Sequence, residues 1–328
     1  MECWPQLKVI EKYMTGGIGC FDKEGLPVRF ERFGYLDVKG MFYSSKKVDL
    51  EMKKLYDQEV ALKVMRQQSE KLGKKIDRLT VILDLDQIGS KQLWRPGLAL
   101  YLHLIKLLED NYPEFVKRLI VINAPKIFPI FFKICRPLIS DDMNKKMRVY
   151  GTNFLPEVLK IIDEEELPAF LGGKQVGPDN DIYCTHRIKA GGLVPESYYL
   201  KDVIDTTEFE STTISAGCKL VLKVPIEQPN CVIRWEFLTE GKDISFGVSL
   251  IPKGSEKQQV VVPASRVQCH MVPEYGSLTC EQLGTYVILF DNSYSWTKGK
   301  KLKYNIEALI EDEELLEEVE QIMNQKIE

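Results

Sequence analysis

The hydrophobic pattern changes about halfway along this chain, and that change limits the folds open to it. Before residue 172, short β-rich runs alternate with helical stretches, which is typical of a largely parallel sheet covered by helices. From about residue 185 onward, short alternating runs are separated by turn formers, which indicates an antiparallel sandwich. The sequence therefore predicts an α/β domain followed by an all-β domain.

The predicted boundaries follow from this pattern. The α/β domain is expected to cover residues 1–175, a glycine- and proline-rich linker 176–184, the sandwich 185–310 and an acidic helix 311–328. Strands are expected at residues 28–34, 79–86, 118–125 and 147–151 in the first domain, with helices including 48–73 and 97–113. Strands are expected at residues 219–226, 231–239, 244–252, 259–268, 285–293 and 301–310 in the second.

Composition and charge exclude several classes of protein. The chain has 328 residues, of which 44% are hydrophobic and 28% charged, as expected for a folded protein of about two domains. No run reaches the roughly 18 apolar residues of a membrane span, and the start lacks a secretory pattern, so we expect a cytoplasmic protein with peripheral membrane association. The net charge of −4 is too small and too scattered for a nucleic-acid partner.

Few residues suggest catalysis. The eight cysteines form no C-x-x-C pair, the three histidines share no motif, and no G-x-S-x-G elbow or phosphate-binding loop appears. Asp84 and Asp86 follow a strand, where they are candidates either for Mg²⁺ or for capping the strand end. We therefore expect no enzyme, no metal site and no cofactor other than a bound hydrophobic ligand.

Residues 123–140, NAPKIFPIFFKICRPLIS, are apolar almost all the way round a helical wheel. Lys126, Lys133 and Arg136 share one narrow stripe. Large apolar residues and one cysteine cover the rest of the wheel: Ile127, Phe128, Ile130, Phe131, Phe132, Ile134, Cys135, Leu138 and Ile139. A helix of about 14 residues is too short to span a bilayer, so it is a core element, a lid over an apolar cavity or a membrane-dipping element. The wheel alone leaves core and lid open.

Several motifs resemble a known family. Residues 71–94, 109–125, 145–151 and 166–174 resemble the CRAL-TRIO lipid-binding domain, and residues 217–250 and 270–309 resemble the GOLD domain that follows it in some relatives. In this family a small helical domain precedes CRAL-TRIO, and we expect this protein to lack it before Trp4. The resemblance implies that residues 123–140 are a gate, which closes a lipid cavity or lies on a membrane, with its basic stripe contacting lipid phosphates.

The resemblance also implies roles for individual residues. Glu114 and Lys146 occupy the places that bind the headgroup in relatives specific for phosphatidylinositol, where an acid accepts inositol hydroxyls and a cation meets phosphate. Met143, Leu79 and Val81 stand where other members carry polar anchors. These replacements favour a largely apolar ligand, such as a tocopherol, squalene, a sterol-like molecule or a retinoid.

The expected function is a non-enzymatic carrier that binds a tocopherol, squalene, retinoid or phosphatidylinositol-type lipid and transfers or presents it at membranes. Its expected partners are the hydrophobic molecule or phospholipid, a transient membrane surface, and proteins bound through the GOLD domain. The alternative is a lipid-sensing scaffold or regulator that acts through the GOLD domain in membrane trafficking.

Overall fold

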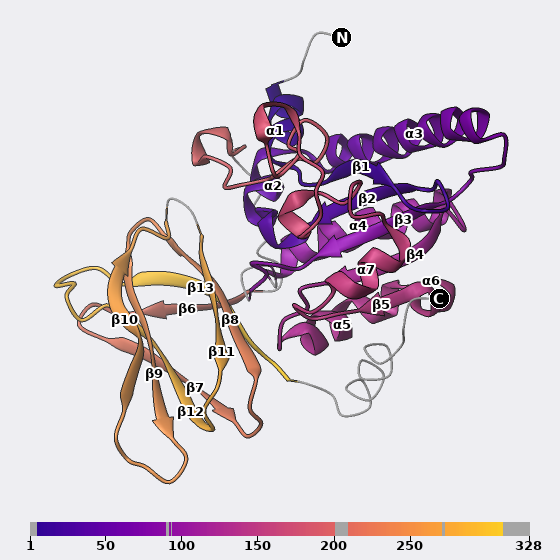
Figure 1. The fold of residues 1–328 in the computed structure, drawn as a ribbon. Helices are drawn as coiled ribbons and strands as arrows, with labels where there is room; N and C mark the ends of the chain where they lie inside the picture. The colour runs from indigo at the N-terminus through magenta and orange to yellow at the C-terminus, as the bar shows by residue number, and fades with distance from the viewer. Residues whose placement is uncertain (1–4, 90–91, 93, 201–208, 271–272, 311–328) are drawn as a thin grey trace. The chain divides into compact units, whose positions relative to one another are not determined.

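The computed structural model describes residues 5–310 except 90–91, 93, 201–208 and 271–272 (Figure 1). Within these residues the chain forms two compact units, one ending at residue 200 and the other beginning at residue 209. The predicted acidic helix at 311–328 lies outside the described residues.

The first unit contains one five-stranded sheet in the order β1-β2-β3-β4-β5. Its strands are β1 (Gly17–Phe21), β2 (Pro27–Arg32), β3 (Leu79–Asp84), β4 (Val116–Ile122) and β5 (Met147–Val149). Strands β2 to β5 are parallel and β1 is antiparallel to β2, which confirms the predicted mostly parallel sheet. The glycine-rich strand β1 was not predicted.

Helices cover this sheet. They are α1 (Pro5–Tyr13), α2 (Val38–Ser44), α3 (Lys47–Leu72), α4 (Arg95–Asn111), α5 (Phe128–Cys135), α6 (Asp141–Lys146) and α7 (Leu155–Ile161). Helix α3 ends at Gly73, whose φ of 64° is a left-handed conformation that glycine adopts without steric cost. In Figure 1 the strands run in order from β1, beside α3, to β5, beside α5 and α6.

The larger packed core of this unit lies on one face of the sheet. A smaller cluster on the other face includes Met65, Leu79 and Phe115. Val28, Phe30, Ile82, Ile120 and Ile122 pack there with Phe154, Val158, Ile161, Ile162, Leu167, Leu171, Cys184 and Ile188. Because Cys184 and Ile188 are fully buried in this core, residues 176–188 are part of the first unit. A bridge between Gly16 and Lys189 extends the same unit. The predicted linker at 176–184 and sandwich start at 185 were therefore wrong, and the first strand of the second unit begins at Glu210.

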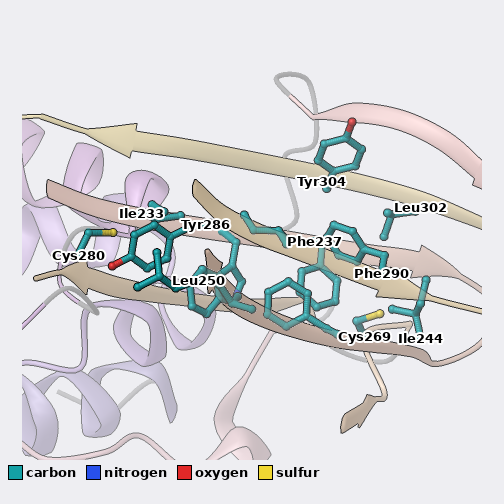
Figure 2. Close-up of a cluster of buried hydrophobic side chains, with 14 of the residues drawn as sticks. Ile233, Phe237, Ile244, Leu250, Cys269, Cys280, Tyr286, Phe290, Leu302 and Tyr304 are labelled. Carbon is teal, nitrogen blue, oxygen red and sulfur yellow. The ribbon is translucent and has the colours of Figure 1, made fainter. Parts of the chain in front are cut away.

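The second unit consists of two four-stranded antiparallel sheets, β10-β9-β12-β7 and β11-β8-β13-β6. Their strands are β6 (Glu210–Ile214), β7 (Lys219–Ile226), β8 (Cys231–Glu240), β9 (Ile244–Pro252), β10 (Gln259–Val267), β11 (Glu274–Cys280), β12 (Gly284–Asp291) and β13 (Lys300–Leu309). Figure 2 shows the apolar core, in which Phe237 and Phe290 are fully buried. The predicted sandwich is confirmed, with β6 and β11 as additional strands.

Candidate ligand cavity

The first unit contains a partly open cavity of about 760 Å³ on the sheet face opposite its larger packed core. The wall consists of side chains from the sheet, from α3, α4 and α5, and from the residues after α5. Its apolar members include Val81, Leu83, Leu98, Leu102, Ile105, Leu108, Leu119, Val121 and Met147. This volume lies in the upper part of the usual range for small-molecule sites, and the wall suits an apolar molecule.

Strand alternation decides which residues of β3 reach the cavity. Leu79, Val81 and Leu83 line it, whereas Thr80 points to the other face and donates a hydrogen bond to Asp22 Oδ2 at 3.0 Å. The β3 positions at which the resemblance implies polar anchors therefore form an apolar wall.

Helix α5 presents one of its faces to the cavity. Phe128, Phe131, Phe132 and Cys135 line the wall at the spacing of a single helical stripe. Ile127 and Ile130 are also buried but lie outside the wall, and Ile134 is half-buried. Ile139 lines the cavity beyond the helix, while the Leu138 side chain is outside the described part of the structure. The helix is apolar on most sides because the cavity lies against one face and protein packs against another.

The sequence predicted one continuous helix in residues 123–140. The structure shows that this prediction was wrong. Helix α5 ends at Cys135, a 3-10 turn covers Arg136–Leu138, and Ser140 caps the separate helix α6. Pro137 lacks a backbone N–H and so interrupts the helical hydrogen bonds. In the part of the chain that the structure describes, the backbone hydrogen bonds of residues 126–139 all stay within the segment or reach Pro125.

The basic stripe is divided between two roles. Lys126 and Lys133 are exposed. Arg136 instead braces the turn, because its Nη2 lies 3.0 Å from Asp141 Oδ1 and its Nη1 donates to the Ile139 carbonyl at 3.3 Å. Arg136 therefore serves the local fold in this conformation, unlike the lipid-phosphate contact that the resemblance implied.

Glu114 and Lys146 both line the cavity, as does Met143. Glu114 is exposed, and Lys146 Nζ is paired with Asp142 on the same helix. The structure thus brings the two proposed headgroup residues to one cavity, and Lys146 already has a counter-ion there. Headgroup binding by this pair stays a prediction.

A charged cluster lies at the β2 end of the cavity, and the sequence did not predict it. Arg29 Nε donates to Glu31 Oε1 at 2.6 Å and Arg29 Nη2 to Asp57 Oδ2 at 3.4 Å, while Lys54 Nζ reaches Glu31 Oε1 at 3.3 Å. Arg29, Glu31, Lys54, Gln58 and Tyr101 all line the cavity. We call these five residues the β2-end cluster.

Electrostatics keep this cluster ionised. Burial opposes the charge of Glu31, but Lys54 and Arg29 hold its pKa below the usual value. Burial likewise opposes the charge of Arg29, yet Glu31 and Asp57 raise its pKa. Burial, with the nearby Glu31 carboxylate, raises the pKa of Tyr101, so its hydroxyl keeps its proton as a donor. The cavity thus has a buried charged end beside an apolar body, in addition to the charged wall residues near Glu114 and Lys146.

Asp84 and Asp86 serve the strand end. Asp84 Oδ1 accepts hydrogen bonds from Asp86 N at 2.9 Å and from Asn123 Nδ2 at 2.8 Å, and Asp86 Oδ2 accepts from the Tyr35 hydroxyl at 2.6 Å. These bonds fix the start of residues 123–140 to the end of β3. They match the capping role that the sequence left as one of two interpretations.

A mostly parallel sheet with an apolar cavity on one face, closed by a short aromatic helix, defines a lipid-binding α/β domain. The CRAL/TRIO domain family matches residues 11–173, which identifies this part of the chain as a CRAL-TRIO domain. CRAL-TRIO domains bind lipids and are generally carriers rather than enzymes. The all-β second unit is consistent with a GOLD-like domain.

Relatives span both units. Protein ctg-1 of Caenorhabditis elegans is 29% identical over 95% of this chain and 82% of its own length. A CRAL-TRIO domain-containing protein of the same organism is 32% identical over 76% of this chain, which spans only 35% of that larger protein. The crystal structure of Sfh5 shares 15% identity over 58% of this chain and 62% of its own, with a TM-score of 0.37. Among the described helices, none has the length and apolarity needed to cross a bilayer.

Proposed function

We propose that this protein is a carrier that holds one hydrophobic molecule in the cavity and exchanges it at membranes by movement of residues 123–140, the gate segment. The observation that carries the proposal is the position of Phe128, Phe131 and Phe132, which close an apolar cavity from a helix of only 8 residues. Fully burying such a side chain is worth roughly 1.5 to 3 kcal/mol, so opening into water is costly.

A bilayer removes that cost. On a membrane the three rings exchange cavity contacts for acyl chains, while the exposed Lys126 and Lys133 meet lipid phosphates. The local backbone bonding of the gate segment supports this movement, because few main-chain hydrogen bonds need to break. Membrane contact therefore shifts the population toward the open form.

We propose that the ligand has a largely apolar body, as tocopherols, squalene, sterol-like molecules and retinoids have. The apolar side chains of Leu79, Val81 and Met143 in the wall support this choice. A phosphatidylinositol-type lipid requires Lys146 to leave Asp142 and, together with Glu114, bind the headgroup.

Ligand transfer between vesicles tests the gate directly. Phe131→Asp with Phe132→Asp should slow transfer by about tenfold or more, because charged side chains do not enter acyl chains. Val158→Ala is the control, since Val158 is fully buried in the packed core across the sheet and its loss lowers stability without touching the gate.

The transfer rate and the thermal midpoint are measured for both variants. If the double variant slows transfer no more than its loss of thermal stability explains, Phe131 and Phe132 are core residues without a role in gating. Native mass spectrometry of gently purified protein, followed by solvent extraction, identifies the ligand. Protein without an exchangeable ligand that still binds partner proteins would support a scaffold that acts through the second unit.

A further inference from the structure

Helix α3 carries polar side chains on the face that packs against the cavity, where apolar side chains would be expected. On the inner face of α3, Leu50 and Met65 are buried as expected, but Lys54 and Gln58 between them are only 6% and 8% exposed. Both side chains line the cavity. Buried polar side chains of this kind are uncommon without a partner or a role.

The β2-end cluster also has more donors than acceptors. In the cavity wall, Arg29 and Lys54 face the single carboxylate of Glu31, which leaves one positive charge in excess there. Outside the wall, Asp57 pairs with Lys53 as well as with Arg29. Among the described residues, Lys54 Nζ makes a single hydrogen bond, and Arg29 Nη1 and the Tyr101 hydroxyl make none. The spare donors line the cavity wall together with Gln58.

The sheet register places this cluster opposite the gate. Arg29 pairs with Val81, Val81 with Leu119, and Leu119 with Met147, so one row of side chains crosses from β2 to β5. Three strand spacings make that row about 14 Å long. Its first member is a cation and the other three are apolar. Such a row matches a ligand with one polar end and an apolar chain.

We propose that the cavity takes a long-chain carboxylic acid, whose carboxylate lies at the β2-end cluster and whose alkyl chain follows the apolar row toward the gate. Lys54 and Arg29 supply charge-assisted hydrogen bonds, and Tyr101 donates a further one. The excess positive charge selects an anion over a neutral hydroxyl. This inference rests on the proposed carrier function and names the ligand class for the same cavity.

Competition binding with hexadecanoic acid and hexadecan-1-ol, which share one alkyl chain, tests the proposal. The acid should bind at least about tenfold more tightly than the alcohol. Lys54→Met should reduce this ratio to within about threefold and leave alcohol binding intact, because Glu31 keeps its bond to Arg29. Tyr101→Phe, which removes only a hydroxyl, should lower the ratio by a few-fold without disturbing the fold.

Lys53→Met is the matched control. It removes the same charge from the same network, but Lys53 bonds to Asp57 and is not part of the cavity wall. The ratio should therefore stay near that of the unaltered protein. Equal binding of acid and alcohol, or a ratio unchanged in both the Lys54 and Tyr101 variants, overturns the acid proposal and leaves the carrier standing. Binding of neither probe overturns both.

Discussion

Glu24 couples the stability of the first unit to pH. It lies between β1 and β2, and its carboxylate accepts hydrogen bonds from Lys117 Nζ and Arg118 Nη2 on β4. These two bonds lower the pKa of Glu24 to about 2, from an ordinary 4.5. A carboxyl whose pKa is depressed by folding stabilises the folded state above its ordinary pKa, and this contribution is lost as the pH falls toward the folded pKa.

We predict that Glu24→Gln lowers the free energy of unfolding at pH 6 by no more than about 1 kcal/mol, because the carboxylate is partly exposed. The difference from the unaltered protein should shrink as the pH falls from 4.5 toward 2. Urea unfolding at several pH values in this window measures it. Glu157→Gln, which removes a pair within a single helix, is the control. A difference that stays constant with pH would contradict the prediction.

Some cavity-lining residues could be predicted from the sequence and others could not. The aromatic side chains of α5 were predictable, because apolar residues at both 3- and 4-residue spacings exceed what one core face requires. Arg29 and Glu31 were not, since alternating charges on a strand normally indicate a solvent-facing side. Lys54 and Gln58 gave a faint signal, as polar residues on the otherwise apolar stripe of a helix.

At the scale of elements, a side-chain hydrogen bond attaches the gate segment to helix α4. Ser140 Oγ donates to Glu109 Oε1 at 3.1 Å and also accepts from Met143 N at 3.2 Å, which caps α6. The same hydroxyl thus performs two tasks, and variants can separate them.

We predict that Glu109→Ala speeds ligand release severalfold, because it removes the attachment to α4 and leaves the α6 cap intact. Ser140→Ala should speed release to a similar degree and also destabilise the protein by about 1 kcal/mol, the usual effect of losing an N-cap. Release kinetics and thermal midpoints of both variants check this. Unchanged release in both would show that the bond does not restrain the gate.

Proline, glycine and polar residues account for three elements that the sequence predicted incorrectly or missed. The gate was expected as one helix, but Pro137 ends it after Cys135. Strand β1 has the sequence GIGCF, and its glycines favour a loop, so pairing with β2 decides its structure. Strand β6 has the sequence ESTTI. Its side chains are largely polar, so it lacks the alternation of apolar and polar residues that predicts a strand. Tertiary pairing overrides local preference in both strands.

At the scale of the whole molecule, every described residue of the cavity wall belongs to the first unit. We predict that a chain ending at residue 208 binds hexadecan-1-ol with a Kd within about threefold of the full-length value. Equilibrium binding, with far-UV circular dichroism to verify folding, measures this. Loss of binding by a folded truncated chain would show that residues after 208 are needed for binding.

The reciprocal variant damages the second unit alone. Phe237 is fully buried between the sheets of the sandwich, so Phe237→Ala should destabilise that unit by about 3 to 5 kcal/mol. Ligand affinity should remain unchanged below the melting temperature of the sandwich. This variant therefore serves as the full-length control for the truncation.

The two faces of the central sheet place different demands on neighbouring residues of one strand. Val81 and Leu119 touch the cavity, whereas Ile82 and Ile120 are fully buried in the packed core. A substitution at the first pair alters which molecule the cavity accepts, and a substitution at the second alters whether the domain folds. Over evolution, such a domain can change its cargo one residue at a time while its folding remains under separate selection.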